Sequence, residues 1–432
     1  MRKYLFVLLS LLCLLPGCSR RDGNPVQENR GAENGKAAQD VRPIKLSLWH
    51  IMNYEGPREV LERAVKRFED ANSDCEVQIQ TFENDSYKVK LSVELASGNA
   101  PDVMFTWGGG HLAELVSGGK VLDLTSNLDE NAWKDRFIDS ALNLCSTDGH
   151  LYGVPLDLSV VLLWCNKDLF QKNGIEFPKT YDDMLDVCSK FRDKGIEPFA
   201  LGNKNQWTGA FYFCYLANRL GGTELFYKAA EDNSIFADES FVKAGTMLRA
   251  LVDAKAFPVG FNGLDDGPAR ARFLAGKSAM LLMGSWVVAR VVAEKPDFLA
   301  NMAALPFPAV AGGKGDPNTV LGGINCGFAV SKDCKAPKKA IELLKYLTAD
   351  EVVGEWCEIG RIPALKTTPQ QEERLPAPTR DALAALRAST SMQPYYDQYL
   401  TPRLAVEHKN TTQNIFAGTM TPEEAAQKMA KK

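Results

Sequence analysis

Strand and helix patterns alternate along the first part of the chain, and this order constrains the fold more than any other feature. Short strands are predicted at Ile44–Trp49, Cys75–Phe82 and Asp102–Trp107. A helix that begins at Pro57 and a second helix at Tyr87–Ala96 separate them. The first helix carries an apolar stripe made of Val60, Leu61, Ala64, Val65 and Phe68. The βαβαβ order predicts a mainly parallel sheet with helices on its faces.

A second series of the same kind follows. It contains a strand at Val160–Cys165, a helix at Thr180–Lys194 and a strand at Glu197–Leu201. Thr180 and Asp183 have the spacing of a capping box, and the stretch Thr421–Glu424 opens the last helix in the same way. The chain has 432 residues, more than the roughly 250 to 300 residues over which one hydrophobic core usually grows. We therefore expect two α/β lobes.

The composition excludes several classes of protein. Hydrophobic residues make up 45% of the chain, charged residues make up 24%, and the net charge is −4. Neither a disordered chain nor a nucleic-acid partner is indicated by these values. The sequence has no Cys-x-x-Cys motif, and its four histidines show no paired spacing, so we expect no metal site and no cofactor. Cys165, Cys188 and Cys214 lie within apolar patterns, where a free thiol packs as a small hydrophobic group.

The N-terminus has the pattern of a bacterial export signal. A basic start, Met1–Lys3, precedes the apolar run Tyr4–Leu15, which is too short to span a bilayer but fits the core of a signal peptide. Residues 15–18, Leu-Pro-Gly-Cys, resemble the lipobox of bacterial lipoproteins, in which the cysteine is acylated and becomes the mature N-terminus. The alternative is an ordinary cleavage site with an incidental cysteine.

These features divide the first 43 residues. We expect a signal peptide at 1–18, a fatty-acyl group on Cys18, and a flexible tether at 19–43, which has too few aliphatic side chains to bury a core. The remaining chain is then held outside the cytoplasm by a lipid anchor in a bacterial membrane.

Residues 276–278, Gly-Lys-Ser, resemble the end of a phosphate-binding loop. Such a loop needs a second glycine five positions before the Gly-Lys pair, and Ala271 occupies that position. Residues 270–274 have the pattern of a helix end instead of a glycine-rich turn. A nucleotide-binding enzyme is therefore not indicated.

Several tryptophans lie where a predicted strand ends. Trp49 and Trp107 end strands, and Trp207 and Trp286 follow strands beside turn residues. In a doubly wound sheet, the loops at the carboxyl ends of the strands converge on a crevice where ligands bind. An indole face covers the apolar C–H face of a pyranose and leaves the sugar hydroxyls free for hydrogen bonds. The pattern therefore predicts a sugar site.

Each tryptophan also has a structural alternative. Trp49 is nearer the core, and Trp107 has the alternative of lying beneath a turn formed by Gly108–Gly110. Three other tryptophans lie within apolar patterns and are expected in the core: Trp133, Trp164 and Trp356.

A series of short stretches follows a fixed order along the chain. After LSLWH and KRFEDAN come ASGNAPDVMFTW, LYGVPLDLSVVLLWCNKDLFQKNGIEFPKTYDDML, FLAGKSAMLLMGSW, LGGINCGFAVSKDCKAPKKAIELLKYL, GRIPAL and AGTMTPEEAAQKM. In this order they resemble the extracellular solute-binding proteins that serve ABC importers, in particular the maltose-binding-like carbohydrate branch. The resemblance runs from Lys45 to Met429.

The resemblance implies a two-lobed, type II periplasmic-binding-protein-like fold with the ligand between the lobes. Each lobe is expected to hold a mainly parallel sheet flanked by helices, and crossing segments join the two. The expected bounds are 44–156 with 305–360 for the first lobe, and 157–304 with 361–432 for the second. The resemblance further implies a monomeric binding protein without enzymatic activity. It would capture a mono- or oligosaccharide and deliver it to permease subunits on separate chains.

Polar candidates for ligand contacts follow the same logic. Asp157 stands just past the end of a predicted strand at the first crossover between the lobes, where its carboxylate would accept two sugar hydroxyls. A solvated loop or a helix cap is the alternative. Asn325 and Arg361 lie in segments that return between the lobes, and their alternative is to pin the hinge by bonding backbone carbonyls.

The loop after the first strand supplies further candidates, for which the alternative is a helix-capping loop. Tyr395, together with Tyr396 and Asp397, is a late candidate, and Asp265–Gly267 is expected to be a turn. The complete set of predicted ligand-binding residues is His50, Asn53, Glu55, Trp107, Asp157, Trp207, Trp286, Asn325, Arg361 and Tyr395.

Two other functions stay open on the sequence alone. The same fold binding a polyamine, a peptide or a phosphate ester is the first, and an anionic ligand would require a cluster of Arg or Lys at strand ends. A secreted glycoside hydrolase is the second, and it needs two carboxylates at a fixed separation. Asp157 with Glu55 or Asp265 is the pair that the sequence offers, and no local motif supports it.

Overall fold

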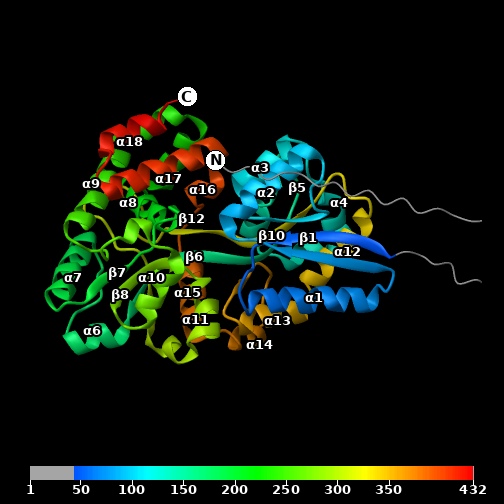
Figure 1. Ribbon diagram of the computed structural model, residues 1–432, viewed down its shortest axis with the longest axis horizontal. Helices are drawn as coiled ribbons and strands as arrows, with labels where there is room; N and C mark the ends of the chain where they lie inside the picture. Colours follow the sequence, from blue (N-terminus) through cyan, green and yellow to red (C-terminus); the bar gives the residue numbers. More distant parts are fainter. Residues whose placement is uncertain (1–42, 432) are drawn as a thin grey trace, which may run out of the picture. The chain divides into compact units, whose positions relative to one another are not determined.

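A computed structural model describes residues 43–431, and one large sheet organises the fold (Figure 1). Its strands have the order β2-β1-β3-β10-β6-β8-β7, with β9 and β11 paired to β6 and β12 paired to β10. These strands are β1 (Ile44–His50), β2 (Cys75–Thr81), β3 (Val103–Thr106), β6 (Val154–Asn166), β7 (Glu197–Ala200), β8 (Ser278–Gly284), β9 (Met302–Leu305), β10 (Val320–Val330), β11 (Ile362–Pro363) and β12 (Met392–Gln393). The short strands β4 (Ser146–Thr147) and β5 (His150–Leu151) pair separately.

The strand directions differ between the ends and the centre of the sheet. At one end β1 runs parallel to β2 and β3, and at the other β7 runs parallel to β8. In the centre β10 runs antiparallel to β3 and β6, and β6 runs antiparallel to β8. The expected parallel pairing is therefore found in the two end regions. The centre is antiparallel because the long strands β6 and β10 cross the molecule in opposite directions.

Strand β6 is longer than the sequence pattern predicts. It has 13 residues, all buried, and the predicted strand at Val160–Cys165 is its second half. Asp157 was expected just past a strand end, and this placement is wrong: it lies within β6 and pairs with Cys326 of β10 and Pro363 of β11. Pro and Asp are poor strand formers, but pairing on both edges outweighs that local preference.

Helices cover both faces of the sheet. They are α1 (Pro57–Ala71), α2 (Asn84–Ser97), α3 (Gly109–Ser117), α4 (Thr125–Asp129), α5 (Asp139–Asn143), α6 (Lys167–Asn173), α7 (Tyr181–Asp193), α8 (Trp207–Glu231), α9 (Glu239–Asp253), α10 (Asp266–Leu274), α11 (Val287–Glu294), α12 (Pro337–Leu347), α13 (Asp350–Glu358), α14 (Pro369–Glu373), α15 (Ala377–Ala388), α16 (Tyr396–Tyr399), α17 (Pro402–Ala417) and α18 (Pro422–Met429). In Figure 1, α1 and α13 lie on one side of β1, and α2 and α3 lie on the other.

Two groups of elements surround the two ends of the sheet. Helix α1 packs against α12 and α13 beside β1–β3, and we call this group the first lobe. Helices α8, α9, α17 and α18 pack together, and α7 and α10 pack on β7 and β8; we call this group the second lobe. Strands β6 and β10 extend between the two groups, so the sheet is continuous and marks no boundary between them. The residue bounds predicted for the lobes therefore stay a prediction.

Most local signals in the sequence are confirmed. The predicted stripe of α1 is buried, and the capping boxes that begin α7 and α18 are both formed. Helix α2 begins at Asn84, three residues earlier than predicted, because the Glu83 side chain accepts a hydrogen bond from the Asp85 N–H and caps the helix.

The segment around the Gly-Lys-Ser sequence is a helix end, as predicted. Helix α10 ends at Leu274, Gly276 has a left-handed backbone with φ of 69°, and β8 begins at Ser278. The predicted turn at Asp265–Gly267 is wrong, because Asp266 and Gly267 form the first turn of α10. Asp-Asp-Gly suits a turn and a helix start equally, and an acidic residue is favourable at a helix N-terminus.

The core contains the expected tryptophans and thiols. Trp133, Trp164 and Trp356 are buried. The cysteines from Cys75 to Cys357 are all buried and form no disulfide, which confirms the prediction for Cys165, Cys188 and Cys214. Across residues 43–431, no helix combines the length and the apolar character that crossing a membrane requires. The predicted signal peptide with Cys18, and the tether up to residue 42, lie outside the described residues.

The three glycines after Trp107 permit a close approach of two backbones. Helix α3 begins at Gly109 and packs against α16. A Cβ at Gly110 would overlap the carbonyl oxygen of Tyr399, and a Cβ at Gly108 would lie 2.5 Å from the carbonyl oxygen of Leu144. The glycine run therefore allows α3 to pack directly on the chain that enters α17.

This contact predicts the effect of one added methyl group. The substitution Gly110→Ala should destabilise the protein by about 1–3 kcal/mol, because the backbone of Tyr399 must shift to admit the Cβ. Gly263→Ala is the matched control, since a Cβ there meets no atom within 4 Å. Urea unfolding of both variants measures the difference, and equal stabilities would show that α3 and α16 do not pack as described.

Candidate ligand-binding site

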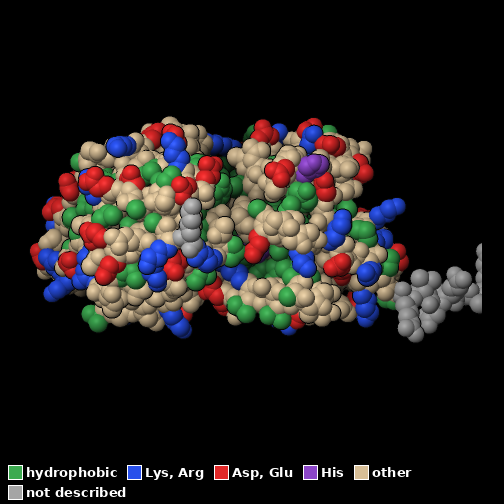
Figure 2. Space-filling model, turned by 90° about the horizontal axis from the view of Figure 1, so that it is seen from above, with side chains coloured by type: hydrophobic (Ala, Val, Ile, Leu, Met, Phe, Trp, Pro, Cys, Tyr) green, Lys and Arg blue, Asp and Glu red, His purple; other side chains and the backbone are tan. Residues whose placement is uncertain are grey.

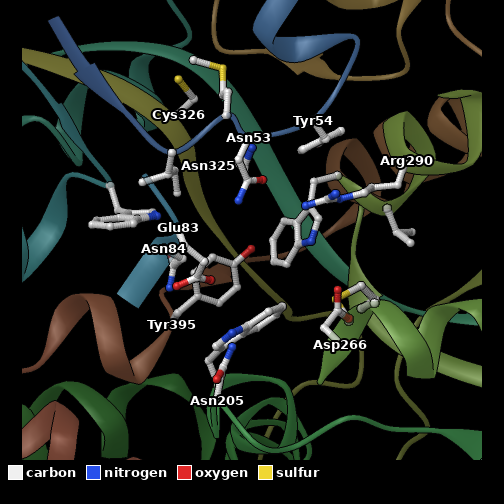
Figure 3. Close-up of a pocket in the computed structure, with 18 of the residues that line it drawn as sticks. Asn53, Tyr54, Glu83, Asn84, Asn205, Asp266, Arg290, Asn325, Cys326 and Tyr395 are labelled. Carbon is white, nitrogen blue, oxygen red and sulfur yellow. The ribbon is translucent and has the colours of Figure 1, made fainter. Parts of the chain in front are cut away.

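A cavity lies between the two lobes, at the carboxyl ends of β1 and β3 and beside the first turns of α8, α10 and α11. Its volume is about 330 Å³, near the lower end of the roughly 300–1,000 Å³ that small-molecule sites occupy. Figure 2 shows the surface hollowed between the lobes, and Figure 3 shows lining side chains that converge on the cavity from both lobes.

The sequence prediction and the cavity lining overlap. Seven predicted residues line the cavity: Asn53, Trp107, Trp207, Trp286, Asn325, Arg361 and Tyr395. The structure places His50, Glu55 and Asp157 outside the lining. Of the two neighbours of Tyr395 named with it, Asp397 lines the cavity and Tyr396 does not. Several lining residues were not predicted, among them Tyr54, Glu83, Asn84, Lys88, Asn205, Phe211, Asp265, Asp266, Arg270, Arg290, Cys326 and Gln398.

Two half-buried indoles form an aromatic wall on the second lobe. Trp207 is the first residue of α8, and Trp286 directly precedes α11. Their ring centroids are 6.1 Å apart with the planes inclined by 57°, and the ring of Tyr395 lies 6.3 Å from that of Trp286. Trp286 lies across Gly284, where a Cβ would overlap the indole. The glycine therefore leaves the space that this orientation of the ring needs.

Trp107 lies on the opposite side of the cavity, at the end of β3. It is 6% exposed. The centroid of its ring lies 4.9 Å from that of Phe105 and 5.9 Å from that of Tyr87, edge to face in both cases. The Lys88 ammonium lies 4.8 Å from the ring centroid. Trp107 is thus largely packed within the first lobe and offers only part of its ring to the cavity.

A buried ion pair lies at the base of the cavity. Arg361 Nη1 donates to Asp157 Oδ2 over 2.6 Å, and Asn325 Nδ2 donates to the same oxygen over 2.9 Å. Arg361 Nη2 also donates to the Tyr54 hydroxyl over 2.7 Å. Asn325 and Arg361 therefore line the cavity and tie β10 and the segment after α13 to β6. Both side chains bond the Asp157 carboxylate, and Arg361 also bonds the Tyr54 hydroxyl. The alternative from the sequence had named backbone carbonyls as their partners.

The two other predicted residues outside the lining have clear positions. His50 is the last residue of β1 and is fully buried; its Nδ1 accepts from the Met52 N–H over 3.0 Å, and its Nε2 lies 3.3 Å from the Thr81 hydroxyl. Burial lowers the pKa of His50 to about 4, so the ring is neutral at neutral pH. Glu55 is exposed in the turn before α1. Of the three candidates predicted for the loop after the first strand, His50, Asn53 and Glu55, only Asn53 lines the cavity.

Sequence signals existed for some of the residues that the prediction missed. Asn84 follows β2, so the same strand-end argument that selected the tryptophans would have selected it. Arg290 is the one charged residue in the otherwise apolar run Val287–Ala293. Asp266 was missed because it was assigned to a turn.

The arrangement suits binding of a ligand with apolar faces and many hydroxyls. The described residues contain no group of three or more His, Cys, Asp and Glu side chains placed to hold a metal ion. The carboxylates nominated for hydrolysis are not paired across the cavity. Asp157 is buried against Arg361, Glu55 faces solvent, and Asp265 binds Lys204 over 2.9 Å.

The chain is similar to known proteins over most of its length. The profile of a family described as bacterial extracellular solute-binding protein matches residues 55–354. The melibiose/raffinose/stachyose-binding protein of Bacillus subtilis (strain 168) is 22% identical over 99% of this chain and 96% of its own. The multiple sugar-binding protein of Streptococcus mutans serotype c is 21% identical over 79% of this chain and 80% of its own.

A solved structure gives the same fold. It is described with xylan utilization by the thermophilic bacterium Caldanaerobius polysaccharolyticus, and it superimposes with a TM-score of 0.84 at 31% identity. The superposition covers 90% of this chain and 99% of the other. The two-lobed α/β fold expected from the sequence is confirmed.

The position of His50 predicts a pH dependence of stability. Its pKa is about 4 in the folded chain and about 6.5 in an unfolded one. Between these values the unfolded chain binds a proton that the folded chain does not, so stability falls as the pH falls from 6.5 to 4. In His50→Gln this loss should be shallower, by up to about 1.4 kcal/mol per pH unit. Urea unfolding across this pH range tests it, and identical slopes would mean that His50 is not buried.

Proposed function

The chain belongs to the bacterial extracellular solute-binding protein family, and on that premise we propose that it is the substrate-binding component of an ABC transporter for a mono- or oligosaccharide. The observation that carries this proposal is the aromatic wall of Trp207, Trp286 and Tyr395 beside amide side chains in one cavity. The names of the relatives in Bacillus subtilis and Streptococcus mutans, which are sugar-binding proteins, support it.

In this proposal the lining residues bind the sugar through both apolar and polar contacts. The indoles of Trp207 and Trp286 cover the C–H faces of sugar rings, and Trp107 contributes an edge from the other lobe. Asn53, Asn205 and Asn325 supply donors and acceptors for hydroxyls. A micromolar dissociation constant corresponds to roughly 8 kcal/mol, which is within reach of a few such contacts.

Ligand binding closes the two lobes. A sugar that touches Trp286 in the second lobe and Asn53 in the first gains both contacts only in the closed form, so its binding shifts the population towards that form. In this proposal the first lobe comprises 44–156 and 305–360, and the second comprises 157–304 and 361–432. The closed protein then delivers the sugar to permease subunits on separate chains.

The family places the protein outside the cytoplasm, and we propose that a lipid holds it there. The basic start, the apolar run Tyr4–Leu15 and the Leu-Pro-Gly-Cys sequence support acylation of Cys18 after cleavage of residues 1–18. Residues 19–43 then join the anchor to the fold. We propose that the protein acts as a monomer and as a binding protein, without catalysis of its own.

A thermal-shift screen tests the proposed function. The chain from residue 44 is heated with each member of a panel of mono- and oligosaccharides, and with polyamines, peptides and phosphate esters as the other arm. A ligand that binds only the folded state raises Tm. We expect a rise with at least one saccharide, and a rise confined to the other arm would replace the proposed ligand class.

Truncation of the central indole tests the site. Trp286→Ala should weaken sugar binding by about 2 kcal/mol or more, a roughly thirtyfold loss, because the aromatic ring that would lie against the sugar is removed. Titration calorimetry measures this loss. The Tm of the ligand-free protein should change little, since Trp286 is only half buried.

Two further variants separate binding from folding. Gly284→Ala keeps the indole but moves it, because the new Cβ would occupy the space of the ring, so it should also weaken binding. Trp356→Ala removes a core indole that is 1% exposed and should cost about 3–5 kcal/mol of stability. A similar stability loss in Trp286→Ala would place its indole in the core and contradict the site.

A further inference from the structure

Two guanidinium groups lie against one tyrosine at an end of the cavity. Arg290 Cζ lies 3.6 Å from the centroid of the Tyr54 ring, and Arg361 Cζ lies 6.0 Å from the same centroid. Tyr54 belongs to the loop before α1, whereas Arg290 belongs to α11 in the second lobe. Figure 3 shows Arg290 reaching from α11 into the cavity beside Tyr54. This end of the cavity is therefore rich in cationic donors.

The other cations that line the cavity already have carboxylate partners. Arg361 binds Asp157 over 2.6 Å. Arg270 binds two carboxylates, those of Asp266 over 2.8 Å and Glu294 over 2.9 Å. Lys88 lies 3.9 Å from Asp397.

Arg290 is the exception. Within residues 43–431 its guanidinium has no carboxylate at ion-pair distance and donates no hydrogen bond to another side chain or to the backbone; its contact is the face of Tyr54. Stacking uses the flat face of the group and leaves its N–H edges available. Burial and the nearby Arg270 charge lower the pKa of Arg290, although Tyr54, Asp266 and Glu294 oppose the change. A half-buried charge without a hydrogen-bonded partner is unfavourable until a partner arrives.

The charges around Arg290 indicate the charge of the ligand group that would bind it. Arg270 holds two carboxylates, so the group formed by Arg270, Arg290, Asp266 and Glu294 has no net charge. An anion would therefore bind through direct hydrogen bonds to Arg290 and would gain little from a long-range field. One free guanidinium matches one negative charge, and its planar fork fits the two oxygens of a carboxylate. A dianionic phosphate would have one charge too many for this site.

We propose that the ligand is an acidic saccharide, whose uronate carboxylate binds Arg290 while its ring lies against Trp286. This inference rests on the proposed function and narrows its substrate class. Arg290 is the residue that selects the acid, and the indoles and amides bind features that acidic and neutral sugars share.

Matched ligand pairs test this proposal by titration calorimetry on the protein. Glucuronate and galacturonate are each compared with their primary amides and with glucose and galactose, and digalacturonate is compared with galactobiose. In at least one pair, the acid should bind about tenfold more tightly or better than its neutral partners, as expected for a charge-assisted bidentate contact. Raising the salt concentration should change this ratio little, because the contact is direct.

Substitution of Arg290 shows whether this residue makes the selection. In Arg290→Gln the affinity for the acid should fall about tenfold or more, with less than a threefold change for the amide, so that the preference disappears. Arg290→Lys keeps the charge without the planar fork and should retain part of the preference. The ligand-free Tm of each variant checks that the fold is intact.

The outcomes separate this inference from the proposed function. Neutral sugars that bind as tightly as the acids, with equal losses for both in Arg290→Gln, would make Arg290 a general hydroxyl donor and overturn the inference alone. Binding of the acids with an unchanged preference in Arg290→Gln would also overturn it. Failure of every saccharide to bind would overturn both proposals.

Discussion

The buried contact between Asp157 and Arg361 is the constraint on which the site depends. It joins a residue inside β6 to a residue after α13, and Asn325 of β10 and the Tyr54 hydroxyl complete the set of partners. Loss of either charged partner would leave the other unpaired in the interior, at a cost of roughly 3–5 kcal/mol. The contact therefore ties β6, β10 and the segment after α13 together beside the cavity.

Local signals explain how much could be predicted from the sequence. The order of strands and helices follows from apolar periodicity, and the starts of α7 and α18 follow from their capping boxes. Trp207 and Trp286 could be selected because turn residues next to a strand end place a side chain at the edge of a sheet. These features depend on neighbours a few residues away, which a single sequence displays directly.

Long-range contacts explain the rest. Asp157 is held in β6 by strands β10 and β11, and its ion-pair partner is 204 residues away, so its local sequence gives the wrong position. His50 stands at a strand end like the tryptophans, but its ring turns into the first lobe to bond the Met52 N–H. The position of Arg290 could not be predicted from its local sequence, because the guanidinium lies against Tyr54, which comes from the other lobe.

The continuity of the sheet has a consequence for how this protein opens. Strands β6 and β10 are hydrogen-bonded to each other and to strands of both lobes, so the lobes do not swing on slack connections. In the proposed opening and closing, we expect the motion to be taken up as altered twist between adjacent strands. The middle of the sheet thus resists rotation of one lobe against the other, so we expect the resting angle of the empty protein to depend on the backbone pairing of β6 and β10.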